Sequence, residues 1–179
     1  MVFEQNSFFR VLLVVVLVMV NKMSAQEHQT GTFGMGIGGI ISIGLQNETG
    51  LDIRAYYATT TEKNKFQIGY HRFFRREFEN TQVFNEFEFG YQRKIYTWEP
   101  LQFYAGLSYL VNNYPISEVA RNTSSLFVTT RELNHGLGLK VTVNFQLSKK
   151  NYIYAELTGK SFGRRYDTFG GGISYQLGR

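Results

Sequence analysis

Cysteine is absent from this chain of 179 residues, and proline occurs only twice. A chain without cysteine has no disulfide framework, no thiolate metal site, no cysteine nucleophile and no cysteine to carry a lipid at a mature N-terminus. Histidine occurs three times, which leaves no convincing set of metal ligands in the sequence. We therefore expect no metal and no cofactor.

Runs of basic residues are missing as well. The formal charge of +5 is compatible with a nucleic-acid partner. The lysines and arginines, however, are scattered among acidic residues and never form a sustained run. We therefore expect no nucleic acid among the partners of the protein.

Long hydrophobic runs are also scarce. The apolar run Val11–Val20 has ten residues, and no later segment approaches the roughly 18 to 20 residues that a membrane-spanning helix needs. The mature chain can therefore enter a membrane only as a closed barrel, because the free edges of an open sheet cannot be left in lipid.

The flanks of this run are those of a secretory signal peptide. Arg10 precedes the run, and the short polar segment Asn21–Ala25, which ends in small residues, follows it. We predict cleavage after Ala25, which divides the chain into a signal peptide of residues 1–25 and a mature domain of residues 26–179. The alternative is a buried N-terminal helix.

Glycine, tyrosine and phenylalanine are abundant, with 18, 12 and 16 residues, and the mature chain alternates between apolar and polar positions. Between residues 136 and 147, apolar residues occupy the odd positions, and glycine or polar residues occupy the even ones. A period of two over this length predicts strands with one apolar face and one polar or small face. No segment of the mature chain shows a convincing helical period.

Eight stretches alternate in this way. They span residues 31–46, 50–60, 64–75, 83–95, 101–112, 128–147, 151–162 and 167–178. The predicted fold is all-β: a closed, antiparallel, up-and-down transmembrane barrel of eight strands, which follows the cleaved signal peptide. The length also allows ten strands, but sixteen strands would use about 160 residues before any loop. An even number of strands places both termini on the same side of the membrane.

The connections alternate between short and long. The short polar turns are predicted at Thr61–Asn64, Tyr96–Pro100 and Ser148–Lys150, and the other connections at Gln46–Thr49, Arg76–Gln82, Asn113–Phe127 and Gly163–Asp167. Short periplasmic turns opposite longer external loops are typical of bacterial barrels. The longest loop contains the candidate residues for contact with a surface partner, namely Tyr114, Ile116, Val119 and Arg121. The alternative is a mobile loop without a dedicated partner.

Aromatic residues on the apolar face are predicted to form two belts at the membrane interfaces. The periplasmic belt comprises Phe33, Tyr57, Phe66, Tyr91, Phe103, Phe145 and Tyr175, with Trp98 in the adjacent turn, and the opposite belt comprises Tyr70, Tyr109 and Phe169. Bilayers select amphipathic rings at this depth.

Charged residues on the polar face are predicted to fill the barrel. They are Arg54, His71, Glu86, Glu88, Lys140 and Glu156. The predicted registers place Arg54 and Glu86 opposite His71, Glu88 opposite Gly69, and Thr158 opposite Lys140, with Glu156 on the diagonal. An eight-stranded barrel is just wide enough for side chains to fill it, so Arg54 and Lys140 should pair with the three glutamates as a polar plug. The alternative is that these residues are solvated in water pockets.

The chain from about Thr30 to Arg179 resembles the eight-stranded outer-membrane barrels of OmpA and OmpX type. The most specific motif is Gly172-Ile-Ser-Tyr175-Gln-Leu177, which is similar to the C-terminal insertion signal of that family, although Gly178-Arg179 close the chain in place of an aromatic residue. The resemblance implies a Gram-negative outer-membrane location and contact with outer-membrane lipid and lipopolysaccharide. It also implies transient binding to periplasmic chaperones and the barrel-assembly machinery, and a monomeric state.

The resemblance leaves the function open between several classes. The favoured hypothesis is a non-enzymatic protein with a membrane-structural or surface-interaction role. The alternatives are a lipid-A-modifying enzyme and a narrow, porin-like solute channel. An enzyme would need a histidine with a hydroxyl or acid partner near the outer leaflet. His135 lies on the outward face there, but Gly136, Leu137 and Gly138 follow it, so we expect no hydroxyl beside it and no catalytic residues.

Two other patterns point elsewhere. Residues 34–39 match the GxGxxG pattern of dinucleotide-binding sites, but they lie in an alternating segment with no helix after it. A soluble lipocalin-like barrel would have to bury Arg54, Glu86, Glu88, Lys140 and Glu156 around an apolar ligand or leave many glycines on its surface. We therefore interpret the glycines as small residues that pack inside a narrow barrel.

N-terminal sequencing of the membrane-extracted protein tests the predicted signal peptide. We expect Gln26, or a residue within a few positions of it, at the start of the mature chain, because Ala25 ends the small-residue segment after the apolar run. A membrane-extracted protein that still begins at Met1 would contradict the predicted export.

Overall fold

The computed structural model describes residues 31–43, 48–77, 80–114, 128–130, 133–163 and 166–177. The predicted signal peptide, residues 1–25, lies outside the described residues. Among the described residues, no helix combines the length and the apolar character that a membrane crossing requires.

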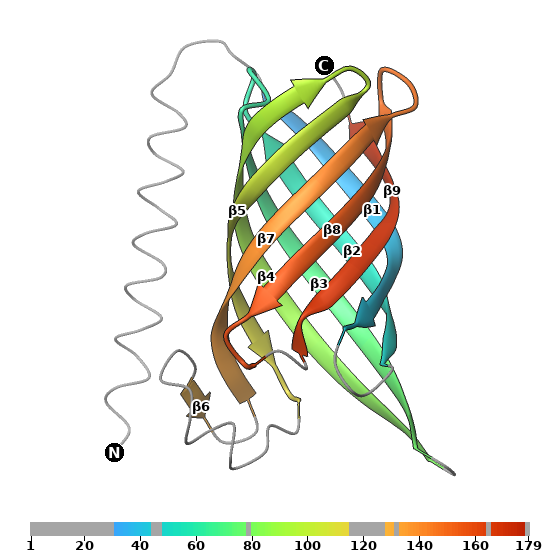
Figure 1. The fold of residues 1–179 in the computed structure, drawn as a ribbon, viewed down its shortest axis with the longest axis vertical. Helices are drawn as coiled ribbons and strands as arrows, with labels where there is room; N and C mark the ends of the chain where they lie inside the picture. The colour runs from blue at the N-terminus through green and yellow to red at the C-terminus, as the bar shows by residue number, and fades with distance from the viewer. Residues whose placement is uncertain are drawn as a thin grey trace. The chain divides into compact units, whose positions relative to one another are not determined.

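Nine strands make up the described part of the chain (Figure 1). They are β1 (Thr32–Ser42), β2 (Thr49–Ala58), β3 (Asn64–Glu77), β4 (Asn80–Trp98), β5 (Leu101–Asn112), β6 (Val128–Thr130), β7 (Leu133–Gln146), β8 (Asn151–Lys160) and β9 (Thr168–Leu177). Each strand except the three-residue β6 is long enough to cross the apolar part of a bilayer when tilted.

Eight of these strands form a closed antiparallel ring. Neighbours in sequence pair from β1 to β5 and from β7 to β9, and the pairings of β1 with β9 and of β5 with β7 close the sheet. The short strand β6 pairs with the start of β7, outside the ring. The prediction of an all-β, closed, eight-stranded antiparallel barrel is confirmed, and the ten-stranded alternative is wrong for the described residues.

Several predicted boundaries are wrong. The predicted strand 128–147 is a short hairpin of β6 and β7. The segments that we predicted as connections at Arg76–Gln82 and Tyr96–Pro100 belong largely to strands, because the β3–β4 ladder continues to Glu77 opposite Asn80 and the β4–β5 ladder continues to Trp98 opposite Leu101. A β-bulge at Ile95 interrupts the alternation, so the period of two in the sequence ends before the strand does.

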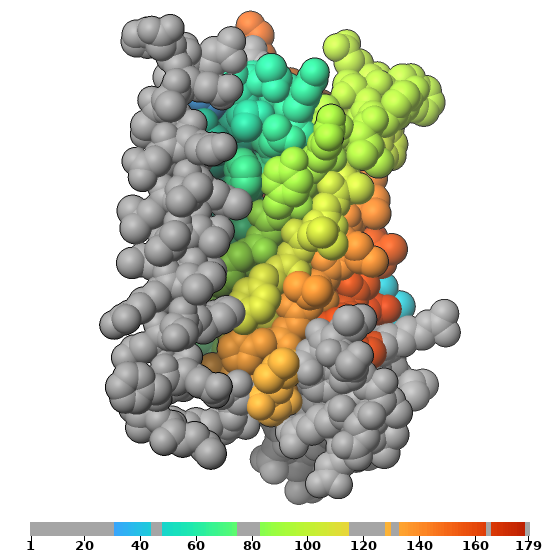
Figure 2. Space-filling view, turned by 90° about the vertical axis from the view of Figure 1, so that its left-hand side faces the viewer, coloured from blue at the N-terminus to red at the C-terminus, as the bar shows by residue number. Residues whose placement is uncertain are grey.

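The apolar face of the barrel points outward. Along β7, Leu139 is 69% exposed, whereas the next residue, Lys140, is 2% exposed. Exposed apolar side chains occur on all eight strands of the ring, and Figure 2 shows the side chains of neighbouring strands as tilted bands across one face. A contiguous apolar surface of this extent is unfavourable in water and favourable in a lipid bilayer.

Several outward aromatic residues pack against each other across neighbouring strands. We call the end of the barrel with the short β2–β3, β4–β5 and β7–β8 connections the turn end, and the opposite end the loop end. At the turn end, the ring centroids of Phe33 and Tyr57 lie 5.0 Å apart, and those of Phe66 and Tyr91 lie 5.3 Å apart. Near the middle of β3 and β4, the centroids of Tyr70 and Phe87 lie 5.1 Å apart. The first two pairs fit the predicted periplasmic belt, whereas the belt at the opposite interface stays a prediction, and Trp98 lies in β4 and not in a turn.

Arginine substitutions at two depths test the outward face. Val141 is an outward residue near the middle of β7, so Val141→Arg should lower the free energy of unfolding by about 2–4 kcal/mol in a bilayer. Leu147 is equally apolar and outward but lies in the β7–β8 turn, where the same substitution should cost about 0–1 kcal/mol. Urea unfolding in lipid vesicles measures both values, and equal costs would contradict the proposed depth of β7.

Candidate functional site

The six residues that we predicted inside the barrel are all buried. Arg54 comes from β2, His71 from β3, Glu86 and Glu88 from β4, Lys140 from β7 and Glu156 from β8. Because side chains alternate along each strand, inward positions on different strands converge on the barrel axis. The structure therefore brings together residues that lie up to about a hundred positions apart, such as Arg54 and Glu156.

Glu156 is the centre of the first group of interactions. Its carboxylate accepts a hydrogen bond of 2.8 Å from Nη1 of Arg54 and lies 2.9 Å from Nζ of Lys140. The hydroxyl of Thr142 donates to the same carboxylate at 2.9 Å. Lys140 also pairs with Glu88, so one ammonium group links two carboxylates. Each charge of this group thus faces an opposite charge, although among the described residues Nε of Arg54 and Oε2 of Glu88 have no hydrogen-bond partner.

Glu86 is the centre of a second group, nearer the loop end. Its carboxylate accepts hydrogen bonds from Nζ of Lys160 at 2.6 Å and from the side-chain amide of Asn112 at 3.0 Å. Nδ1 of His71 lies 3.0 Å from the same carboxylate. On its other side, Nε2 of His71 lies 3.3 Å from Asp52. His71 therefore connects the two groups, because Asp52 pairs with Arg54.

Three of the predicted cross-strand relations agree with the observed registers. His71 is opposite Glu86 and Gly69 is opposite Glu88, while Lys140 is opposite Thr158, next to Glu156 on the diagonal. The predicted pairing of Arg54 with His71 is wrong, because Arg54 is opposite Gly69 and Asp52 is opposite His71.

The β2–β3 turn explains this error. The last ladder pair is Ala58 with Lys65, and Thr59 donates its backbone N–H to the carbonyl of Asn64 at 2.9 Å. The turn therefore comprises residues 60–63, one residue earlier than the predicted Thr61–Asn64, and this moves the partner of each β2 residue by two positions. A shift of two residues preserves the face on which each side chain lies, so Arg54 still points inward.

Sequence reasoning missed two charged members of the network, Asp52 and Lys160. Each lies on the same inward face as a residue that was found, two positions from Arg54 and four positions from Glu156 respectively. Tyr154 was also missed. Its hydroxyl donates to Asp52 at 2.8 Å, and the guanidinium of Arg54 lies 4.0 Å from the centroid of its ring. All three residues occupy alternate positions on the inward face of β2 or β8. The period of two in the sequence identifies them when it is applied to every position of these strands.

A glycine seam between β1 and β9 makes room for Tyr154. A Cβ atom on Gly38 would lie 2.5 Å from the hydroxyl of Tyr154 and 2.3 Å from the backbone oxygen of Gly171. Gly172 is equally constrained, since a Cβ atom there would lie 2.2 Å from the backbone oxygen of Ile37. The residues with the GxGxxG pattern thus belong to this closely packed strand pair, as small residues of the barrel wall.

Aromatic and apolar side chains cover the network at the loop end. This apolar cap consists of Ile40, Phe73, Phe84, Leu110, Tyr114, Phe162 and Tyr166, all of which are buried. The ring of Tyr114 has its centroid 5.4 Å from those of both Phe73 and Tyr166. Below the cap, Nζ of Lys160 lies 5.4 Å from the centroid of Phe73. The cap separates the polar network from the loops.

The position of Tyr114 corrects one prediction. We predicted it as an exposed contact residue of the longest loop, but it is buried in the apolar cap, where its ring packs against the neighbouring aromatic residues. The other predicted contact residues of this loop, Ile116, Val119 and Arg121, lie outside the described residues.

Two further predicted features lie on the outward face. Tyr175 and Leu177 of the C-terminal motif are exposed at the end of β9, while Gly172 lies in the glycine seam. His135 was expected to have no hydroxyl beside it, and this expectation is wrong: the hydroxyl oxygen of Tyr109, on β5, lies 2.7 Å from its Nδ1. Tyr109 escaped notice because it is close to His135 through strand pairing and not in sequence.

The acidic groups inside the barrel are engaged in ion pairs. The carboxylates of Asp52, Glu86, Glu88 and Glu156 all face ammonium, guanidinium or imidazole groups. Within the described ranges, no group of three or more histidine, aspartate or glutamate side chains could hold a metal ion. The arrangement is therefore suited to holding the barrel wall together across the lumen.

The fold is that of the eight-stranded outer-membrane β-barrels. The chain is similar in structure to Ail, the attachment invasion locus protein of Yersinia pestis, solved in complex with the heparin analogue sucrose octasulfate. The TM-score is 0.57 at 13% sequence identity, over 82% of this chain and 99% of that one.

Two other solved structures share the fold. The N-terminal β-barrel domain of Pseudomonas aeruginosa OprF matches with a TM-score of 0.51 at 11% identity, over 83% of this chain and 98% of that domain. The de novo designed protein TMB2.3 matches with a TM-score of 0.53 at 15% identity, over 86% of this chain and all of the designed one. No protein-family model matches the sequence, and no curated protein matches it. Structural likeness at such identities establishes the fold.

A glutamine substitution tests the energetic role of Glu156. Glu156→Gln removes the charge that Arg54 and Lys140 share and should lower the free energy of unfolding by about 3–5 kcal/mol, because a buried cation would lose its partner. Glu99 is exposed in the β4–β5 turn, and Glu99→Gln should change the free energy of unfolding by at most about 0.5 kcal/mol. Urea unfolding in lipid vesicles measures both, and equal small losses would show that the central pairs contribute little.

Proposed function

We propose that this protein is a monomeric outer-membrane barrel of a Gram-negative bacterium with a membrane-structural or surface-interaction role, no catalytic activity and an interior closed to solutes. The observation that carries the proposal is the distribution of polarity, with apolar side chains outside and ion pairs inside. Soluble proteins have the reverse arrangement. Outer-membrane lipid and lipopolysaccharide are then the permanent surroundings of the outward face.

The closed interior is supported by where the ion pairs run. Arg54 on β2 pairs with Glu156 on β8, Lys140 on β7 with Glu88 on β4, and Lys160 on β8 with Glu86 on β4. In each pair the two strands are not neighbours in the ring, so the side chains extend across the lumen. The apolar cap adds a second obstruction at the loop end. These features favour an anchor over the alternative of a narrow, porin-like channel.

The outer loops are the part that we assign to surface interaction. Ail is an attachment invasion locus protein by name, and Neisserial surface protein A (NspA), which matches this chain with a TM-score of 0.50 at 13% identity, is a surface protein by name. Tyr114 is buried in the apolar cap and is no longer a candidate for contact with a partner. The remaining candidates in the longest loop are Ile116, Val119 and Arg121, which follow Tyr114 in the sequence. The fixed end would hold the loop at the barrel rim and reduce the entropy that it loses on binding.

The enzymatic alternative rests on His135, which has a tyrosine partner. The rings of Tyr109 and His135 stack with centroids 6.1 Å apart, and both are partly buried. A phenol is a weak nucleophile, and serine or an acid is the usual partner of a catalytic histidine. The pair is better explained as a polar contact between amphipathic rings at the membrane interface.

Assembly of the barrel requires export and insertion. We propose that residues 1–25 are removed after export, and that chaperones and the barrel-assembly machinery bind the chain transiently. Gly172, Tyr175 and Leu177 would serve as the insertion signal, which is supported by the exposure of Tyr175 and Leu177 on the last strand.

Cell fractionation followed by planar-bilayer recording tests this proposal. The protein should appear in the outer-membrane fraction as a band whose gel migration changes on heating, and the same folded protein should give no steady conductance, because the lumen-crossing pairs fill it. Recovery from another compartment would contradict the location. Steady, sizeable single channels from the folded protein would contradict the closed interior and favour the channel.

A further inference from the structure

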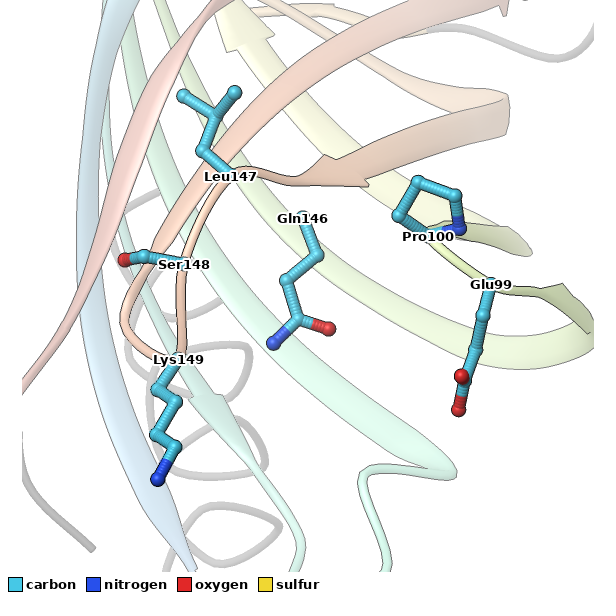
Figure 3. Close-up of a pocket in the computed structure, with 6 residues that line it drawn as sticks. All are labelled: Glu99, Pro100, Gln146, Leu147, Ser148 and Lys149. Atoms are coloured by element: carbon cyan, nitrogen blue, oxygen red, sulfur yellow. The ribbon is translucent and has the colours of Figure 1, made fainter.

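Two adjoining hollows open at the turn end of the barrel. The smaller, of about 280 Å³, lies between the β4–β5 and β7–β8 turns, and Figure 3 shows Gln146 in it between Lys149 and Glu99. The larger, of about 380 Å³, shares Gln146 and Lys149 with the first. Its lining consists of Glu62, Gln102, Gln146, Lys149, Lys150, Tyr152 and Gln176. Three turns and the end of β9 thus surround one polar mouth.

Lys65 lies at the same end of the barrel and is buried on the inward face of β3. Its Nζ is 4.3 Å from the ring centroid of Tyr104 and 4.8 Å from that of Tyr56. The other inward cations at the middle and loop end, Arg54, Lys140 and Lys160, each contact a carboxylate. Within the described part of the chain, Lys65 has no carboxylate at ion-pair distance. The faces of two aromatic rings attract an ammonium group but compensate its burial less than an anion does.

Hydrogen bonds connect the surroundings of Lys65 to the larger hollow. The hydroxyl of Tyr104 donates to Oε1 of Gln102 at 3.0 Å, and the hydroxyl of Tyr152 donates to Oε1 of Gln176 at 3.4 Å. Both amides line the hollow. With their oxygens engaged as acceptors, these amides retain their NH₂ groups as donors for a ligand. A hydrogen-bond acceptor with negative charge fits such a lining.

The charges at this mouth favour an anion as well. Lys149 and Lys150 line the larger hollow, and Lys65 lies against the ring of Tyr104, whose hydroxyl donates to the lining residue Gln102. Glu62 is paired with Lys94 at 3.3 Å, which leaves Glu99, in the smaller hollow, as the other acidic residue of the lining. Positive charge is therefore in excess, and low-dielectric walls strengthen its effect on an anion.

We propose that the turn end of the barrel is a binding site for a small oxyanion such as phosphate, with Lys65 at its base and Lys149 and Lys150 at its rim. The long, flexible stem of Lys65 allows its ammonium group to approach an anion in the hollow. A free phosphate ion and a phospholipid headgroup present the same chemistry. The side of the membrane that the site faces follows from the proposed location, whereas binding itself does not depend on it.

Titration with inorganic phosphate tests the site. The probe is the backbone amide spectrum of the ¹⁵N-labelled full barrel in micelles of a maltoside detergent, which carries no phosphate group, with chloride used to hold the ionic strength constant. Saturable shifts should appear near Lys65, Gln102 and Lys149, and Lys65→Met should weaken the apparent affinity by about tenfold or more, as expected for loss of a buried charge partner. Lys63→Met is the matched control and should leave the affinity unchanged. Lys63 lies two residues before Lys65 in the β2–β3 turn, is exposed, and lines neither hollow.

Other outcomes of the titration overturn the proposal. Shifts that do not saturate, or that chloride alone reproduces, would mean an adventitious ion only. An unchanged affinity in folded Lys65→Met would remove the assigned base of the site. If Lys65→Met does not fold, the double variant Lys149→Gln/Lys150→Gln, at exposed turn positions, must weaken binding, and an unchanged affinity contradicts the proposal.

The source of the phosphate group is distinguished by a second arm. Nanodiscs with an anionic phospholipid and no added phosphate should give the same shifts if a headgroup occupies the site, whereas shifts that need added phosphate identify the free ion. This experiment is separate from bilayer recording, so a failed titration leaves the proposed closed barrel intact, and a conducting barrel leaves the anion site intact.

Discussion

A sheet that is placed in lipid cannot leave an edge with unpaired N–H and C=O groups, and this constraint determines most of the structure described above. The sheet meets it by pairing β1 with β9 and β5 with β7. Closure with eight strands gives a lumen that side chains alone can fill. Since side chains alternate along a strand, an apolar outer face leaves every second residue pointing into that narrow space. The choice of inward residues is therefore tightly limited, and glycines and paired charges are the solution that this sequence uses.

Pairing of charges follows from the same constraint. The low dielectric of the barrel wall makes an isolated charge costly, so each acid in the middle of the lumen needs a base within contact distance. Glu156 illustrates this, because it contacts Arg54, Lys140 and Thr142 together. The pairs link strands that the ladder does not join, so they brace the barrel against flattening. At the loop end, aromatic and apolar side chains packed around Tyr114 fill the lumen instead of further ion pairs. They shield the buried Lys160–Glu86 pair from solvent.

Sequence patterns predicted the parts of the structure that depend on alternation. The span 101–112 was predicted and β5 has the same bounds, because its alternation continues to both ends. The β3–β4 register was predicted correctly, whereas the β2–β3 register was not, because the turn conformation around Glu62, with its φ of 51°, has no marker in the alternation. Tyr114 could not be placed either, since it lies beyond the last residue of β5, where the period of two no longer applies.

Contacts across the lumen were the least predictable. Which acid pairs with which base depends on the shear of the whole barrel, which places Glu156 beside Arg54 from the far wall. The same global geometry brings Tyr109 next to His135 and leaves Lys65 between two tyrosine rings. Local patterns identify the face on which a residue lies, while the closed ring decides its partners.

The central claim is that the apolar face is in lipid and the charged face is in the lumen. Spin labels on single cysteines along β7 measure this directly, and the cysteine-free chain allows such labels without background. Collision with dissolved oxygen, which concentrates in the bilayer, should be frequent at Leu137, Leu139 and Val141 and rare at Lys140. Collision rates without a period of two, or with the maximum at Lys140, would contradict the account.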